Sequence, residues 1–557
     1  MLTLPLVLAC STVSDPAHRR EVPEESAPSQ VYDTQVEQIE GADDPSEALF
    51  DPTRIHDVYL EMDAQDWLTV RDSPTSKTWA RADLRWGEQD LAEIGLRAFG
   101  SGSMRAGKPS LKLSFDRFVD GQELAGLDEL KLDNSSQDYG YLNELLATSA
   151  LRRAGVPASR TGWVRLHVNG EPAGFFVLLE SVDDRFVERW FGHDQGALYS
   201  MNAHNWGQGL NPMDEPLFWY EPETSFGGDG SELKAAAEAL RAMDADQIEA
   251  LIDTEGFFRE SVARSVMGSL DSFSADGNNF YLFVDEGQVR VIPWDCDVDL
   301  GVWYTSTALA VDPEQPWLTS PWSYNSQSYA AYTDPVLVWN LQQGRDPGAL
   351  IEELLAGPLD WATLDAEAVA AVELIRDDVH EDVFGVGSSF EVRAHAVRLF
   401  LHSRWSALAG RDVADCEPVD GALQVADLDP QGSVGWGSLM VDGNDWGPGL
   451  MIGGEHHCTG LFAHAPSTVT LQLPEGYAEL SGGAGMQDWG RAACGDGGVF
   501  SVWQGETELW RSGAVLEYEP ARSFGPLPVS PGELTLRVEA NAGYSCDTSA
   551  WVDLELR

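Results

Sequence analysis

The hydrophobic pattern of the chain changes character near Cys416. Before that point, alternating segments such as "IHDVYLEM" are interspersed with helix-period segments such as "YGYLNELLATSALRRA", and this mixture is typical of an α+β domain. After it, glycine becomes frequent and short alternating segments such as "STVTLQLP" and "ELTLRVEA" are separated by turns, which predicts an all-β jelly roll or sandwich. The 557 residues are enough for two cores, so we expect domains over residues 51–412 and 418–557.

The charge of the chain narrows the class of its partners. It has 35 Lys and Arg against 91 Asp and Glu, a net charge of −56. A protein that binds nucleic acid needs a basic stripe to displace counterions, so no nucleic-acid partner is expected, and anionic lipid surfaces are disfavoured for the same reason. Acidic side chains suit divalent cations, which favour oxygen ligands, although most of this charge is expected to be solubilising surface.

The N-terminus indicates export. Residues 1–10, "MLTLPLVLAC", resemble the signal segment of bacterial lipoproteins, in which the cysteine, here Cys10, is lipidated. This resemblance implies an exported protein, anchored in the cell envelope (outer membrane) or extracellular, that meets the membrane only through that lipid. Residues 11–50 are rich in Pro, Ser, Glu and Asp without an apolar period and are expected to be a disordered tether.

The remaining cysteines fall into two groups. Cys296 lies alone in an apolar strand and is expected to be a buried free thiol. An exported chain permits disulfides, so we expect up to two, with three pairings open, among the cysteines of the last third of the chain: Cys416, Cys458, Cys494 and Cys546.

The segment "SLDSFSADGNNFYLFVDEGQVRVIPWDCDVDLG" carries the clearest chemistry. Asp271 precedes two strands, Asn279 opens the first strand, and Asp295 and Asp297 follow the second. A hydroxyl nucleophile needs a carboxylate to accept its proton, and Mg²⁺ bridging phosphates needs oxygen ligands. The alternative interpretation is a β-hairpin with solvated acids at its ends.

A glycine- and serine-rich loop lies between two other strands, in "AEIGLRAFGSGSMRAGKPSLKLSF". Its backbone N–H groups, with Gly100 and Gly102, and the side chain of Arg105 are candidates to cover phosphates. Lys108 and Lys112 project on one face of the returning strand. On spacing alone this remains a common hairpin pattern.

Together these segments resemble the CotH kinase family, named for a bacterial spore-coat protein. Over about residues 54–412 the family's motifs occur in order, and the segments that match them are "RAFGSGSMRAGKPSLKLSF", "LKLDNSSQDYGYLNELLA", "LHVNGEPAGFFVLLESVDDRFV" and "DSFSADGNNFYLFVDEGQVRVIPWDCDVDLG". The resemblance implies an atypical protein-kinase-like fold that uses ATP and Mg²⁺ (or Mn²⁺) to phosphorylate Ser or Thr of surface or secreted proteins.

The resemblance also implies residue roles. Lys112 or Lys108 would contact the phosphates, and Glu144 would orient that lysine. Asp271 would be the catalytic base, with Asp276 as the alternative.

The metal would be held by Asn279 and Asp295, with Asp297 as a second candidate. Glu180 matches a family glutamate without an assigned role. The family's Asn-Ser-Ser is Ser-Gly-Ser at residues 101–103, which puts the phosphate loop in question.

The last domain resembles NPCBM carbohydrate-binding modules. The matching segments are "MIGGEHHCTGLFAHAPSTVTLQL", "GGVFSVWQGETELWRSG" and "LTLRVEANAGYSCDTSAWVDLEL". This resemblance implies polysaccharide binding, for which Trp436, Trp446 and Trp489 are candidates because flat rings stack on sugars. Alternatively these tryptophans fill the core. His464 matches a family histidine.

Three functions follow as alternatives. The first is an exported atypical Ser/Thr protein kinase with a glycan-binding module. The second is a surface scaffold or adhesion protein whose kinase fold no longer turns over. The third, a glycoside hydrolase, requires two carboxyl groups at a fixed separation, which nothing in the sequence fixes.

Overall fold

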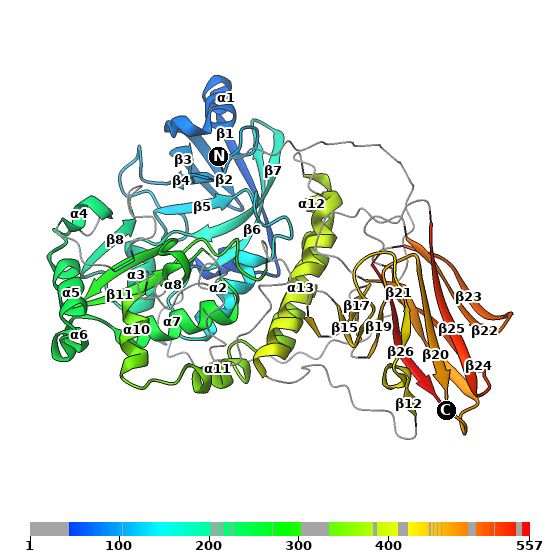
Figure 1. Cartoon of the computed structure of the whole chain (residues 1–557). Helices are drawn as coiled ribbons and strands as arrows, with labels where there is room; N and C mark the ends of the chain where they lie inside the picture. The colour runs from blue at the N-terminus through cyan, green and yellow to red at the C-terminus, as the bar shows by residue number, and fades with distance from the viewer. Residues whose placement is uncertain are drawn as a thin grey trace, which may run out of the picture. The chain divides into compact units, whose positions relative to one another are not determined.

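The computed structural model describes two parts of the chain, each taken here by itself (Figure 1). The described residues are 44–102, 104–201, 209–210, 215–223, 227–269, 271–301, 334–382, 387–409, 422–444, 447–448, 450–453, 455–457, 459–487, 497–516, 519–541 and 548–557. Several predictions fall outside them: the signal segment, the tether up to residue 43, the proposed disulfides, and Trp446 and Trp489.

A closed seven-stranded barrel opens the first part. The strand order is β1-β2-β3-β4-β5-β7-β6, and the parallel pairing of β1 with β6 (Ile55 opposite Trp163) closes the ring. Alternate residues such as Leu113 and Leu132 fill the interior, as the period of a strand requires. The strands are β1 Ile55–Met62, β2 Ala80–Trp86, β3 Gln89–Ala98, β4 Leu111–Ser114, β5 Glu129–Asp133, β6 Thr161–Val168 and β7 Glu171–Glu180.

An Asn-Gly pair, the dipeptide that most strongly favours a two-residue hairpin turn, connects β6 to β7. Asn169 and Gly170 have φ of 53° and 80°, and positive φ at both central residues is what a type I′ hairpin turn needs. The side chain of Asn169 also accepts the backbone N–H of Met62 at 2.9 Å. The turn therefore fixes the end of β1 as well as its own hairpin.

One boundary of the first part is corrected. The segment after β1 is a helix, α1 Ala64–Asp72, which the carboxylate of Asp63 caps by accepting the N–H groups of Gln65 and Asp66. The end of the predicted tether is ordered: η1 Glu47–Phe50 places Leu49 and Phe50 in the core of the barrel. The folded part therefore begins before residue 51.

A second sheet of order β11-β10-β8-β9 follows the barrel. Helices surround it and share a core with α2 and the barrel strands β6 and β7. The strands are β8 Ala197–Met201, β9 Tyr220–Pro222, β10 Phe280–Asp285 and β11 Gln288–Pro293. The helices of this part are η2 Pro74–Ser76, α2 Asn143–Arg153, α3 Asp184–Phe191, α4 Pro216–Trp219, α5 Ser231–Ala242, α6 Ala245–Leu251, α7 Thr254–Val266, α8 Phe273–Asp276, α10 Pro335–Gln342, α11 Pro347–Leu355, α12 Trp361–Glu381 and α13 Gly387–Ala409.

The second part is the all-β fold that the sequence predicts. Two antiparallel sheets, of six and five strands, enclose an apolar core around Trp551 and Phe500. Its elements are β12 Leu423–Gln424, η5 Val425–Leu428, β13 Gln431–Ser433, β14 Met440–Val441, β15 Gly443–Asn444, β16 Gly447–Pro448, β17 Leu450–Ile452, β18 Glu455–His457, β19 Gly460–Phe462, β20 Ser467–Leu473, β21 Glu479–Met486, β22 Gly498–Gln504, β23 Thr507–Val515, β24 Arg522–Pro528, β25 Gly532–Ala540 and β26 Ser549–Leu556.

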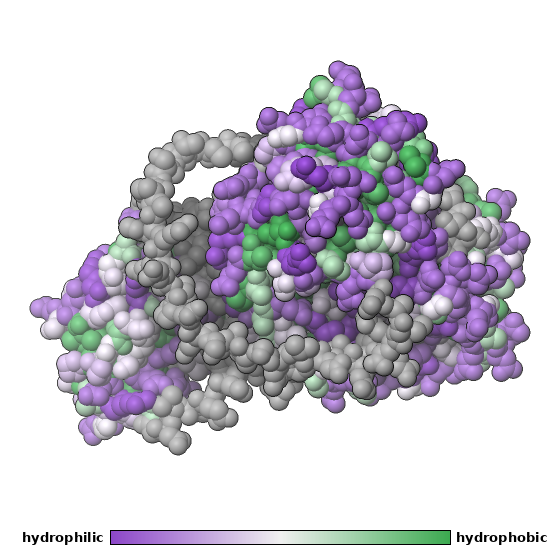
Figure 2. Space-filling view, turned by 180° about the vertical axis from the view of Figure 1, so that it is seen from behind, coloured by the Kyte–Doolittle hydropathy of each residue, from purple (hydrophilic) through white to green (hydrophobic). Residues whose placement is uncertain are grey.

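The surface agrees with the charge of the sequence. In the view of Figure 2, hydrophilic residues dominate the described surface and hydrophobic residues form small separate areas. Within the described residues, no helix is long and apolar enough to cross a membrane.

Candidate active site

The hairpin of β10 and β11 brings two of the predicted site residues, Asn279 and Asp295, to one end. Its register runs from Phe280 opposite Pro293, and the N–H of Trp294 donates to the carbonyl of Asn279 at 2.9 Å, beyond the last strand pair. This contact holds Asn279 and Asp295 at one end of the hairpin. Both residues have positive φ, 55° and 54°, a backbone conformation that Asn and Asp adopt more readily than other side chains.

Asp271 joins this group through two amides. Asn278 donates its Nδ2 to the Asp271 carboxylate at 2.6 Å. The Nδ2 of Asn279 reaches the backbone carbonyls of Asp271 at 3.2 Å and Asp295 at 3.4 Å. The structure therefore brings Asp271, Asn279 and Asp295 together. The side chain of Asp276, the alternative base, lies outside the described residues.

The carboxyl groups of Asp295 and Asp297 are surrounded by protein and lie near other acidic side chains. Burial, followed by the nearby charges of Asp133 and Asp271, raises the pKa of Asp295 to about 7, although part of its side chain reaches solvent. Burial and then Asp295 raise the pKa of Asp297 well above its usual range. Such shifts mark sites where like charges are concentrated.

Glu144 belongs to the same acidic group. It is buried in the first turn of α2, and burial, then Asp295, raise its pKa well above the usual range, while Arg264 opposes the shift. Its Oε2 atom is buried without a hydrogen-bond partner in the described structure. A carboxyl in this environment favours its neutral form.

The two predicted lysines have partners other than Glu144, which corrects the expected lysine–Glu144 pair. Lys112 forms an ion pair with Glu129 on the neighbouring strand. Lys108 is buried, and its Nζ lies 2.5 Å from the Asp382 carboxylate and donates to the Tyr141 hydroxyl at 2.9 Å. The strand pairing and the C-terminal end of α12 supply nearer carboxylates than α2 does.

The expected phosphate loop connects β3 to β4. The N–H of Phe99 donates to the carbonyl of Ser110 at 3.0 Å and closes its base. Gly100 has a φ of 100°, where a side chain would be strained, whereas a Cβ on Gly102 would meet nothing within 4 Å. Arg105 is exposed and donates to the Ser136 carbonyl at 3.2 Å.

A buried arginine supports the turn after β11. Arg264 donates to the Cys296 sulfur at 2.8 Å and lies 3.3 Å from the Asp299 carboxylate. The side-chain amide of Asn143 also donates to the carbonyl of Asp299, which ties α2 to the turn that carries Asp297. Cys296 is a buried free thiol, as predicted.

The donor set fits a divalent cation in its chemistry. Asn279, Asp295 and Asp297 offer oxygen atoms, and Glu144 has an unpartnered buried oxygen beside them. No three His, Cys, Asp or Glu side chains of the described residues are grouped closely enough to hold an ion by themselves. Mg²⁺ is usually bound by one or two carboxylates together with oxygen ligands from outside the protein, so these residues fit a site that needs further ligands to be complete.

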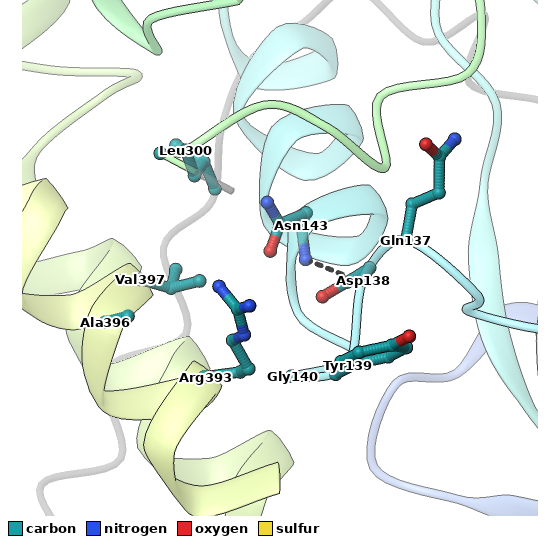
Figure 3. A pocket seen from close by; sticks show the side chains of 10 residues that line it. Gln137, Asp138, Tyr139, Gly140, Asn143, Leu300, Arg393, Ala396 and Val397 are labelled. Atoms are coloured by element: carbon teal, nitrogen blue, oxygen red, sulfur yellow. Dashed lines mark hydrogen bonds between the residues drawn. The ribbon is translucent and has the colours of Figure 1, made fainter. Parts of the chain in front are cut away.

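A pocket lies beside the N-terminus of α2 (Figure 3). Asp138 accepts the backbone N–H of Asn143 there at 2.7 Å, and burial raises the Asp138 pKa to about 7. Arg393 extends from α13 on the opposite side. None of the residues predicted from the sequence lines this pocket, so it lies outside the predicted site.

The second part offers one candidate on its surface. Trp436 is 58% exposed, and its ring lies 6.0 Å from that of His464 in an edge-on arrangement. His464 is buried, and its Nδ1 lies 2.7 Å from the carbonyl oxygen of Ala465. Trp551 is fully buried in the core.

Comparison with known families identifies both parts. The model of the CotH kinase protein matches residues 96–396. The chain belongs to the CotH kinase family. The model of the NPCBM/NEW2 domain matches residues 421–557, so the CotH kinase domain is followed by an NPCBM domain.

Individual relatives cover smaller shares. Alpha-1,3-galactosidase B of Akkermansia muciniphila is 35% identical over 124 residues, which span 21% of this chain and 15% of that protein. CBM51 from Clostridium perfringens GH95, solved with methyl-galactose, is 20% identical over 24% of this chain and 99% of its own, with a TM-score of 0.22. A chain of the Shewanella oneidensis HipA–HipB–operator DNA complex is 14% identical over 57% of this chain and 69% of its own, with a TM-score of 0.28.

Sequence reasoning did not single out Lys131, which lies beside the candidate site, and it left Glu180 without a role. The buried Lys131 places its Nζ 4.1 Å from the centre of the Trp294 ring, and its charge acts on Asp295. The motif "ELKLD" around it reads as an ordinary strand, so only the alternation Glu129, Lys131, Asp133 marks one polar face. Glu180 binds both Arg160 and Arg189, which gives it a structural role.

Proposed function

We propose that the CotH kinase domain transfers the terminal phosphoryl group of ATP to Ser or Thr hydroxyls of surface or secreted proteins. The observation that carries this proposal is the gathering of Asp271, Asn279 and Asp295 at one end of the β10–β11 hairpin. A base, oxygen ligands and a nearby lysine are the parts that phosphoryl transfer requires.

The residues divide the work as follows. Asp271, held by Asn278 at 2.6 Å, accepts the proton of the substrate hydroxyl. Asn279, Asp295 and Asp297 would hold Mg²⁺ or Mn²⁺, which when bound neutralises the negative charge on the phosphates. Cationic side chains of the barrel orient the phosphates so that the hydroxyl meets the terminal phosphorus in line.

A label-transfer assay tests the proposal. The full chain is incubated with labelled ATP, Mg²⁺ or Mn²⁺ and a Ser-containing carrier, beside Asp295→Asn and the control Asp90→Asn, which changes an exposed strand residue. We expect transfer to fall at least about 100-fold in Asp295→Asn and to persist in Asp90→Asn. Absence of transfer by the unmodified chain, or equal transfer by both variants, contradicts the proposal.

A second candidate function is a silent scaffold that keeps the fold without turnover. The observation favouring it is the position of Glu144 among acids, with both predicted lysines paired elsewhere. In that case the label-transfer assay gives no product with either metal, while the protein remains folded.

For the NPCBM domain we propose glycan binding at the exposed face of Trp436. The support is the domain family, together with a flat apolar ring that is open to solvent. The named relative is a galactosidase, so galactosides are the first panel to test. A glycan array without a hit for the full chain contradicts this part.

We extend the proposal to export with a lipid on Cys10. The support is the sequence "MLTLPLVLAC" and a function that needs surface substrates. Mass spectrometry of the mature protein should find an acylated Cys10. An unmodified Cys10 rules out the anchor and leaves the other two proposals unaffected.

A further inference from the structure

Three cations lie in register across the barrel. Arg97 on β3 is directly opposite Lys112 on β4, which is directly opposite Lys131 on β5. Their strand neighbours, including Leu96 and Leu113, fill the barrel core. Because side chains alternate between the two faces of a strand, the three cations share the outer face. We call Arg97, Lys112 and Lys131 the basic row.

The protein neutralises this row incompletely. Glu129 pairs with Lys112. In the described structure the Lys131 ammonium has only the face of Trp294 as a contact, and the buried Nε of Arg97 has no hydrogen-bond partner. Like charges directly opposite one another destabilise a sheet, so the arrangement costs stability in the absence of an anion.

The neighbouring acids do not balance the row. Asp133 follows Lys131 by two residues, but its carboxylate is taken up by the Ser110 hydroxyl at 2.8 Å and the Ser135 N–H at 2.7 Å. Asp295 lies near the Lys131 end, within range of its charge. The Lys131 end of the row therefore lies near Asp295, a candidate metal ligand, whereas the Arg97 end does not.

The dimensions suit a chain of phosphates. Neighbouring strands are about 4.8 Å apart, so three opposed cations extend over roughly 10 Å. Lysine ammonium and arginine guanidinium groups are the usual donors to phosphate oxygens. A linear polyanion along the row would give the Lys131 ammonium and the Nε of Arg97 acceptors that they lack in the described structure.

We propose that the basic row binds the polyphosphate chain of the nucleotide, with Lys131 on the terminal phosphate beside Asp295 and Arg97 at the far end. This inference rests on the proposed kinase function and names residues for it. Lys112 then lies in the middle of the row, with Glu129 holding it in place.

Binding of inorganic tripolyphosphate and of ATP with Mg²⁺ by the full chain tests the row. The variant Lys131→Met keeps a long apolar stem against Trp294 and removes the charge. Lys131→Arg keeps the charge, and Lys77→Met removes an exposed charge elsewhere. We expect both ligands to bind about 10- to 100-fold more weakly to Lys131→Met, with binding retained in Lys131→Arg and Lys77→Met.

The melting temperature separates this role from a structural one. Since Lys131→Met removes a repelling charge from the row, its melting temperature without ligand should be equal to or above that of the unmodified chain. A structural lysine would instead lower it. Arg97→Gln should weaken both ligands in the same direction.

The outcomes distinguish this inference from the kinase proposal. Label transfer with unchanged binding by Lys131→Met overturns the row and leaves the kinase function standing. Row-dependent binding of tripolyphosphate without label transfer supports the row and contradicts the kinase function. Failure of the unmodified chain to bind either ligand overturns both.

Discussion

The CotH kinase domain and the NPCBM domain differ in what they bury. The described residues of the kinase domain bury ionisable groups at many positions, among them Lys108, Lys131, Glu144, Arg264 and Asp297. In the described residues of the NPCBM domain, no Asp, Glu, Lys or Arg side chain is buried, and its buried polar residues are Ser, Thr, Gln and one His.

This difference indicates where the candidate functional groups of each domain lie: inside the kinase domain and on the surface of the NPCBM domain. Burying a charge is costly unless it is paired, so a fold retains buried charges mainly where they act or hold an acting group. In the kinase domain the acids converge on one end of a hairpin. The NPCBM domain keeps an apolar interior and leaves its candidate ligand contact, Trp436, on the outside.

The largest expected loss of stability comes from a substitution in the apolar core of the NPCBM domain. Trp551→Ala removes a fully buried ring that lies 5.3 Å from that of Phe500, and we expect it to cost about 3–5 kcal/mol of stability. Hydrogen exchange followed by mass spectrometry should show lost protection in peptides of residues 422–557 only. Lost protection across both domains would contradict their separate cores.

The next largest loss of stability is expected when the buried ion pair of Lys108 and Asp382 in the kinase domain is removed. Asp382→Ala leaves the buried Lys108 ammonium without its carboxylate, which we expect to cost about 3 kcal/mol. Exchange protection should fall in peptides of the kinase domain. The control is the double variant Lys108→Met, Asp382→Leu, which should recover most of the loss because an apolar pair replaces the ionic one. No recovery would assign the loss to packing.

The acids predict a smaller, pH-dependent effect. The pKa of Asp295 is about 7 in the fold against 3.8 for a free side chain, so the folded state binds this proton more tightly. Its contribution is present below about pH 4 and is lost as the pH rises to about 7. With solvent reaching part of the group, we expect a loss of about 1–2 kcal/mol.

Urea unfolding at pH 5 and pH 8 measures this effect. The midpoint of the unmodified chain should fall more between the two values than that of Asp295→Asn, which cannot titrate. Equal falls would show that Asp295 already ionises freely in the fold. The same deprotonation predicts that Mg²⁺-dependent nucleotide binding strengthens as the pH rises through 7.

Much of the fold and part of the candidate site can be predicted from the sequence. The features that cannot be predicted depend on contacts between residues that are distant in the sequence. Alternation, the Asn-Gly turn and the order of motifs predict the strands and bring Asn279 and Asp295 to one hairpin end. The partners of Lys108 and Lys112 are not visible, because Asp382 is distant in sequence and Glu129 depends on strand register. Lys131 was missed because only the pairing of β4 with β5 aligns it with Lys112.

The smallest effect on stability is expected for a substitution of Trp436 on the surface of the NPCBM domain, where glycan binding should change instead. Trp436 is 58% exposed, so Trp436→Ala should change stability by no more than about 0.5 kcal/mol. If the ring stacks on a sugar, affinity for a glycan bound by the unmodified chain should fall about tenfold. Leu516→Ala, at 49% exposed, is the matched control and should retain binding. Unchanged binding by Trp436→Ala would move the glycan site elsewhere, whereas a lowered melting temperature would show that the ring supports His464 rather than a ligand.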